Sequence, residues 1–173
     1  MIKAEDAMNT ARMLLDTPYS EMDCIALIRA VIKRSAGGMK DYRCEGTNWL
    51  WRSIGNSGKY RHLVWRQEHT QGACGGMLAF KRNGEDIHHV GLVTDEGTVI
   101  HASSVMGSVV ETPLDDSWSC LGQHRYIEIS QKTTEYRNEH EKDEDSMRIV
   151  VIDSEGRRFE PIGDWRVLIG GVD

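Results

Sequence analysis

The spacing of apolar residues predicts two helices at the start of the chain. Over residues 3–16 apolar side chains recur every three or four positions, which is the period of an amphipathic helix. A turn follows at Thr17-Pro18-Tyr19, and residues 24–32 are then almost entirely apolar. Asp23 precedes this second segment in the position of an N-cap, and Gly37-Gly38 closes it. Because the second helix is apolar on most sides, we expect it to be buried.

Residues 39–75 have no clear period. Three tryptophans, Trp49, Trp51 and Trp65, lie there among polar and glycine-containing stretches. We interpret the region as one or two short helices joined by long loops. The tryptophans are expected in the core, and the alternative is that they stack on sugar rings.

Beyond Gly76 the pattern changes to the alternation that is typical of strands. We expect five strands, over residues 77–80, 88–94, 98–102, 108–111 and 124–129. Turn signals such as Asn83-Gly84 and Asp95-Glu96-Gly97 separate them. Two helices followed by a run of antiparallel strands predict an α+β fold.

The end of the chain differs in composition from the rest. Residues 131–146 are almost wholly polar and charged, which is typical of a solvated linker, so we expect one domain over residues 1–130. Residues 147–173 carry short apolar runs around the turn Ser154-Glu155-Gly156 and predict two or three strands. So few strands are not stable alone, and we expect this tail to pack on the domain or on a partner.

Length and charge limit the classes of function. A chain of 173 residues suits one domain with appendages, and its net charge of -6 argues against binding nucleic acid or an anionic membrane through a basic surface. No segment predicts membrane insertion, and the first residues carry charges where a signal peptide needs an apolar run. We therefore expect synthesis in the cytoplasm, so a substrate outside the membrane would require another route of delivery.

One of the four cysteines stands in a chemically favourable place. Cys24 begins the predicted buried helix, where unpaired N–H groups and the helix dipole are expected to lower the pKa of a thiol. Cys44, Cys74 and Cys120 have no such context, and the set contains no Cys-x-x-Cys pair and predicts no disulfide framework. The alternative for Cys24 is a structural role in an apolar helix.

A nucleophilic thiol needs a neutral imidazole as base and a third group that fixes the imidazole tautomer. Pairing of two predicted strands across the turn at residues 95–97 would bring His89 beside His101. We predict Cys24 as nucleophile, His89 as base and His101 as the orienting residue. Alternation alone does not separate His89 from His88, and either could be a core histidine.

A zinc site built from the same histidines is the metal alternative. Adjacent residues on a strand point to opposite faces, so only one of His88 and His89 could join His101 and a cysteine. We therefore expect neither a metal nor another cofactor.

Four short segments, taken in order, resemble the NlpC-type cell-wall peptidases of bacteria and their phages. They are residues 17–24, 75–80, 89–91 and 99–102, and the resemblance spans about residues 1–130. It implies a papain-like fold with helices packed on a small antiparallel sheet, and a Cys-His-polar triad. It also implies hydrolysis of peptide bonds to D-γ-glutamyl or diaminopimelate residues in peptidoglycan.

The resemblance assigns roles to single residues. Cys24 matches the nucleophile, His89 the base and His101 the third member of the triad. Asp23 matches an acid that in some members helps to hold the free amine of the substrate, and Tyr19 matches a tyrosine near the cleft. Both are therefore candidates for substrate binding, and the bland alternative for Asp23 is a helix cap.

The sequence departs from the family pattern beside the nucleophile. Ile25-Ala26 stands where Ser-Gly is usual, Ser20-Glu21-Met22 stands where Trp-Gly-Gly is common, and Met77 stands where an aspartate is usual. Loss of the serine alters or removes a substrate contact. Two alternatives therefore stay open: a non-catalytic phage-tail or docking protein built on a degenerate peptidase domain, and a thiol amidase or acyltransferase with a non-wall substrate.

The expected partners follow from the resemblance and the tail. Peptidoglycan stem peptides are the expected substrate. Residues 147–173 are expected to dock to a phage structural protein, so that a phage particle or a phage-like device delivers the enzyme to the cell wall.

Overall fold

The computed structural model describes residues 1–53, 56–130, 151–152 and 158–159. The chain divides into two compact units, Met1–Tyr136 and Arg137–Asp173. In the second unit the described residues form one antiparallel pair, β7 (Val151–Ile152) with β8 (Arg158–Phe159). The predicted linker, residues 131–146, and most of the predicted tail lie outside the described residues.

The first helix, α1, covers Ala4–Arg12 and is amphipathic as predicted. Acidic residues occupy its first turn and Arg12 its last, which favours the helix dipole. The prediction that this helix extends to residue 16 is wrong, because the chain turns after Arg12 and Asp16 adopts a positive φ of 65°. A helix cannot continue through a residue in that conformation.

The second helix, α2, covers Cys24–Arg34. The predicted N-cap is confirmed, since the Asp23 side chain accepts a 2.6 Å hydrogen bond from the backbone N–H of Ala26. The helix ends at Ser35, whose hydroxyl donates to the carbonyl of Val31. It therefore runs two residues beyond the predicted segment and stops before the glycines.

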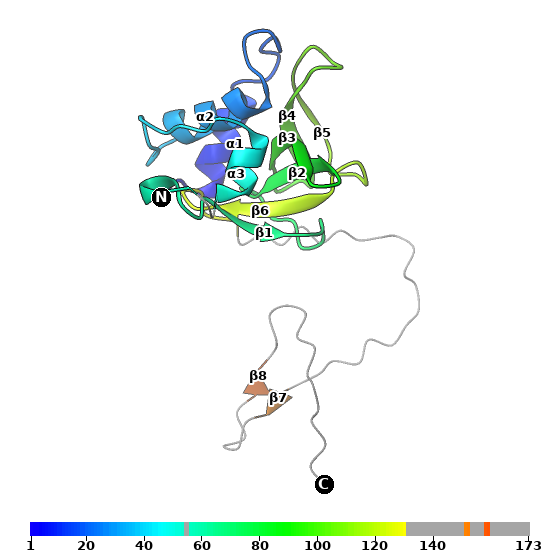
Figure 1. Cartoon of the computed structure of the whole chain (residues 1–173). Coiled ribbons are helices and arrows are strands. Elements are labelled where there is room, and N and C mark those ends of the chain that lie inside the picture. The colour runs from blue at the N-terminus through cyan, green and yellow to red at the C-terminus, as the bar shows by residue number, and fades with distance from the viewer. Residues whose placement is uncertain (54–55, 131–150, 153–157, 160–173) are drawn as a thin grey trace. The chain divides into compact units, whose positions relative to one another are not determined.

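A six-stranded antiparallel sheet forms the rest of the first unit, in the order β1-β6-β2-β3-β4-β5. Figure 1 shows the helices gathered on one side of it. The predicted α+β class is confirmed. The strands are β1 (Val64–Gln67), β2 (Leu78–Asn83), β3 (Asp86–Val93), β4 (Thr98–Ser103), β5 (Ser108–Pro113) and β6 (Cys120–His124).

Two parts of the sheet differ from the prediction. The strand expected over residues 124–129 is wrong, because the last strand is β6 and Ile127 forms only an isolated parallel bridge with Ile2. The region interpreted as helices and loops does contain α3 (Thr47–Trp51) and a 3-10 turn, η2 (Gly58–Tyr60). It also contains β1, which the sequence pattern did not reveal.

Apolar side chains cover both faces of the sheet. Leu92 and Ile100 belong to a large cluster shared with the helices, whereas Val93 and Val99 belong to a smaller cluster. Successive residues of a strand point to opposite faces, so the two clusters lie on opposite sides of the sheet. The helices therefore fix one face, and the loop between β5 and β6, through Trp118, covers part of the other.

Candidate functional site

The sheet opens between β3 and β4. These strands are paired at only two positions, Leu92 with Ile100 and Val93 with Val99. Beyond them β3 stays paired with β2 and β4 stays paired with β5. The two halves of the sheet therefore separate on the far side of Gly91, and backbone groups that a continuous ladder would use become available there.

Cys24 occupies this opening from the first turn of α2. Its side chain is buried, with 8% of the residue exposed. The backbone N–H groups of Val90, Ile25 and Cys24 itself lie near its Sγ and act to lower the pKa of the thiol. Val90 directly follows His89 in β3. The helix start therefore brings the thiol to the strand that carries the predicted base.

Burial sets the charge state of this thiol. It raises the pKa of Cys24, Asp23 raises it further, and the three N–H groups lower it without reversing the direction. The expectation that the helix start lowers this pKa is therefore wrong for the resting protein. Cys24 is a neutral thiol at pH 7, surrounded by donors that would stabilise a thiolate once it forms.

The two predicted histidines meet across the opening. His89 Nε2 lies 2.9 Å from His101 Nδ1, and the rings are nearly perpendicular. His101 Nε2 in turn lies 3.1 Å from the hydroxyl of Thr112 on β5. His88 is exposed at a bulge in β3, so His89 is the member of the pair that reaches the site.

One proton arrangement of this chain leaves a base available. If His89 Nε2–H donates to His101 Nδ1, His101 Nε2–H donates to Thr112, and His89 Nδ1 keeps a lone pair. The opposite arrangement places a proton on that nitrogen. Among the hydrogen bonds of residues 1–53 and 56–130 none joins Cys24 to His89 directly, and the thiol lies instead near the backbone N–H of Val90, the residue after His89.

Both histidines are neutral at pH 7. Burial, followed by the charges of His101, Lys81 and His88, lowers the pKa of His89 to about 4. Burial and Lys81 lower the pKa of His101 to about 4, against a small opposing effect of Asp115. A neutral imidazole beside a neutral thiol is the pair that general-base catalysis requires.

Two residues that contact the histidine pair were not predicted from the sequence. Thr112 lies two residues beyond Val110, the cross-strand partner of His101, and the register of the β4–β5 hairpin would have identified it. Trp118, 3% exposed, packs against His89 with the rings tilted by 30° and their centroids 5.6 Å apart, and meets His101 edge-on at 5.3 Å. It comes from the loop between β5 and β6, and no local pattern connects it with the histidines.

Gly91 has a steric reason to follow His89-Val90. A Cβ atom at this position would lie 2.4 Å from Cγ1 of Val99 and 2.9 Å from Cβ of His101. Any side chain there would force β3 and β4 apart. The glycine therefore permits the close strand approach that joins the two imidazoles.

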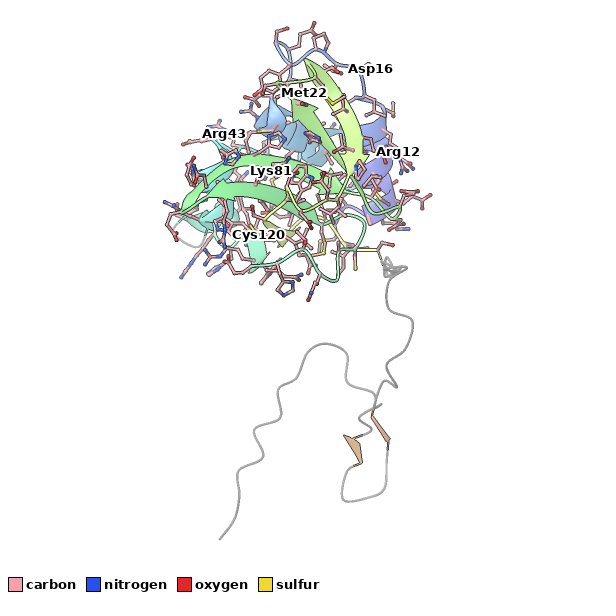
Figure 2. All side chains as sticks on the ribbon, turned by 90° about the vertical axis from the view of Figure 1, so that its right-hand side faces the viewer. Arg12, Asp16, Met22, Arg43, Lys81 and Cys120 are labelled. Carbon is pink, nitrogen blue, oxygen red and sulfur yellow. The ribbon has the colours of Figure 1, made fainter. Side chains whose placement is uncertain are left out.

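Tyr19 and Asp23 both lie next to Cys24. The loop that carries Tyr19 is fixed to the β4–β5 hairpin, because the N–H of Tyr19 donates to the carbonyl of Gly107 at 2.8 Å. Figure 2 shows Asp16 and Met22, at the two ends of this loop, near that end of the hairpin. Burial, then Cys24, then Asp23 raise the pKa of Tyr19, which places its phenol close to both groups. Their roles in substrate binding stay predictions.

The departures next to the nucleophile have structural consequences. Ile25 is buried in the large apolar cluster, so it packs in the core where a serine would offer a hydroxyl.

Among the tryptophans, Trp51 packs against Phe80, whereas Trp65 is 56% exposed on the edge strand β1.

Metal and membrane functions gain no support from the described part of the chain. No three side chains of His, Cys, Asp or Glu come together there as a ligand set. In the same residues no helix combines the length and apolarity needed to cross a bilayer.

The fold of the first unit is that of the NlpC/p60 hydrolases. It resembles the peptidoglycan hydrolase RipB from Mycobacterium tuberculosis with a TM-score of 0.53 and 18% identity, over 72% of this chain and 65% of that one. It resembles an NlpC/P60 family protein from Bacillus cereus with a TM-score of 0.51 and 20% identity, over 72% of this chain and 40% of that one. The comparison with the NlpC/p60 domain of the peptidoglycan hydrolase SagA has a TM-score of 0.49 and 20% identity, over 68% of this chain and 96% of that one.

The likeness to RipB and to the Bacillus cereus protein confirms the predicted NlpC-type fold. No family model matches the sequence, and no curated protein matches it. The chain spans less than two thirds of the length of RipB and of the Bacillus cereus protein.

Proposed function

We propose that this protein is a cysteine peptidase that hydrolyses peptide bonds in the stem peptides of bacterial peptidoglycan. The observation that carries the proposal is the hydrogen-bonded chain from His89 through His101 to Thr112, beside the Cys24 thiol at a helix start. The cell-wall substrate is supported by the shared fold with RipB, which is named a peptidoglycan hydrolase.

The reaction begins from uncharged groups. Cys24 Sγ attacks the carbonyl carbon of the peptide bond while His89 Nδ1 takes the thiol proton. His89 is then an imidazolium whose Nε2–H donates to His101 Nδ1, and Thr112 holds His101 in the tautomer that accepts this bond. The backbone N–H of Cys24 stabilises the oxyanion that forms on the former carbonyl oxygen.

The intermediate then collapses to products. The C–N bond breaks, His89 gives its proton to the leaving amine, and the acyl group remains on Cys24 as a thioester. His89 next takes a proton from water, and the resulting hydroxide attacks the thioester carbonyl. The thiolate of Cys24 leaves and takes the proton from His89, and a new carboxylic acid is released.

Digestion of purified muropeptides tests this function. The wild type is expected to cut stem peptides, Cys24→Ala is expected to leave them intact, and Cys74→Ala, a half-exposed cysteine outside the site, is expected to behave as the wild type. Mass spectrometry of the products reads the outcome. Intact stems with the wild type would contradict the proposal.

A second candidate is a non-catalytic docking protein built on the same fold. It is supported by the raised pKa of Cys24 and by the core position of Ile25. The rate of Cys24 alkylation by iodoacetamide at pH 7 separates the candidates, because a base at His89 removes the thiol proton as the sulfur attacks the reagent. A fall in this rate in His89→Ala favours the enzyme, and equal rates favour the docking protein.

The substrate and the route of delivery are separate proposals. A Cys24-dependent reaction on other amides, with muropeptides untouched, would favour a thiol amidase or acyltransferase. Docking of residues 147–173 to a phage structural protein is supported by the apolar runs that follow the charged segment 131–146.

A further inference from the structure

Lys81 lies directly beside the proposed base. It is the cross-strand partner of His89 in the β2–β3 ladder, so the two side chains leave the sheet on the same face. Figure 2 shows Lys81 over the middle of the sheet. Its side chain is half-buried, and nothing in the sequence pattern marks it as functional.

Two contacts fix the ammonium group of Lys81. Its Nζ lies 4.6 Å from the ring centroid of Trp118, over the ring, and donates a 2.8 Å hydrogen bond to Oγ of Ser117. Ser117 is held in turn, since its hydroxyl and its backbone N–H both donate to Asp115. A long flexible side chain is thereby anchored at its charged end.

Trp118 connects this ammonium with the histidines. The indole is buried and contacts both imidazoles, with its ring tilted against His89 and edge-on to His101. Because Lys81 contacts the same indole, its ammonium helps to fix the positions of Trp118, His89 and His101 relative to one another.

The charges around the pair come from every element that packs on it. On His89, burial acts most strongly, followed by His101 of β4, Lys81 of β2 and His88 of β3. On His101, burial and Lys81 oppose protonation and Asp115 of the β5–β6 loop favours it. Of these groups Lys81 is the fixed cation. A fixed cation near an imidazole opposes its protonation. It also makes an imidazolium, once formed, a stronger acid toward a leaving amine.

We propose that Lys81 is a positioning residue of the site: its ammonium, anchored on Trp118 and Ser117, holds the indole that fixes His89 and His101 in the orientation in which they share a hydrogen bond. The same cation adds to the burial that opposes protonation of the pair. This inference rests on the proposed function for its catalytic meaning, whereas the state of the histidines can be measured without any substrate. The proposed function and the positioning role of Lys81 can therefore be disproved independently.

Nitrogen-15 NMR titration of the histidines in the full chain tests the proposal. In Lys81→Met, which keeps the apolar stem, the midpoint for His89 and His101 is expected to rise by about half a pH unit or more. Lys81→Arg keeps a cation over the indole and is expected to retain the wild-type midpoint. The exposed Lys40 offers the control Lys40→Met, which is expected to change nothing. An unchanged midpoint in Lys81→Met would overturn the proposal.

A second variant covers the contact through the indole. Trp118→Phe keeps a ring against the histidines and weakens the cation–π contact, so the midpoint is expected to move in the same direction by less. If neither Trp118→Phe nor Lys81→Met shifts the titration midpoint of the histidines, both residues serve packing alone and the proposal fails.

Steady-state kinetics of Lys81→Met test whether the residue affects catalysis. With muropeptides as substrate, the acid limb of kcat/KM is expected to move upward in Lys81→Met with KM unchanged. A higher KM with an unmoved acid limb would instead make Lys81 a substrate contact and contradict the positioning role. If no muropeptide is cleaved, the proposed function fails while the NMR titration still decides the state of the pair.

Discussion

At the scale of single residues, the site is built from groups that are neutral at rest. Burial raises the pKa of the Cys24 thiol and lowers the pKa values of His89 and His101 to about 4. In the proposed reaction the thiolate therefore forms during attack, with backbone N–H groups already near the sulfur. An ion pair between Cys24 and His89 is not needed before the substrate arrives.

This charge state predicts the pH profile of kcat/KM. Activity should be lost as the pH falls through about 4, because the histidine pair then binds a proton and His89 no longer accepts one from the thiol. It should be lost again at alkaline pH, where the thiol has lost the proton that the leaving amine requires, and this limb should lie above the ordinary thiol range because burial raises the pKa of Cys24. An acid limb near the ordinary histidine value of about 6.5 would contradict the neutral pair.

Thr112 offers a test of the hydrogen-bonded chain. Thr112→Val keeps the shape of the side chain and removes the hydroxyl that fixes the tautomer of His101. We expect kcat to fall about tenfold, equivalent to about 1.4 kcal/mol, with KM unchanged. Thr112→Ser restores a hydroxyl and should recover most of the loss, whereas an equal loss in both variants would point to packing.

At the scale of elements, local signals predicted the parts that hold the proposed catalytic residues. The Asp23 cap fixes the start of α2, and the turn at residues 95–97 joins β3 to β4. β1 gave no local signal because it is a four-residue edge strand whose pairing partner, β6, lies far along the chain. The alternation of residues 124–129 misled because the chain leaves the sheet after His124.

Inside the site, too, features with a local sequence signal were predicted and features that depend on distant segments were not. The meeting of His89 with His101 follows from two adjacent strands, so the sequence predicted it. Trp118 reaches them from a distant loop, and the pKa of Cys24 depends on burial by the whole fold. Neither property can be derived from a local pattern.

Gly91→Ala tests the strand approach. The added methyl group should force β3 from β4, break the bond between His89 and His101, and lower the free energy of unfolding by about 1–3 kcal/mol. Urea denaturation measures the stability, and histidine NMR the bond. Gly46→Ala is the control, since a Cβ there would meet nothing within 4 Å. Equal effects of the two substitutions would refute this role of Gly91.

At the scale of the whole molecule, a third histidine links folding to pH. His124 is fully buried, with Nε2 3.0 Å from the hydroxyl of Tyr42 and Nδ1 accepting from the N–H of Tyr126. Burial lowers the pKa of His124 to about 3. Both ring nitrogens are used in the neutral form, so protonation would cost the bond to Tyr126.

A group with a depressed pKa in the folded state makes the unfolded chain the better proton binder. The free energy of unfolding should therefore fall as the pH drops from about 6.5 toward 3, by up to about 1.4 kcal/mol per pH unit for His124. Denaturant titrations of the wild type and His124→Gln measure this. The variant should be less stable at pH 7 and show a shallower slope below pH 6, and identical slopes would refute the linkage.

The central claim is hydrolysis of a stem peptide bond through Cys24, and digestion of muropeptides in oxygen-18 water measures it most directly. The account predicts that the wild type releases fragments carrying one oxygen-18 in the new carboxylate, that Cys74→Ala does the same, and that Cys24→Ala releases none. Fragments without the label would indicate acyl transfer in place of hydrolysis. Labelled fragments from Cys24→Ala, or intact stems with the wild type, would contradict the claim.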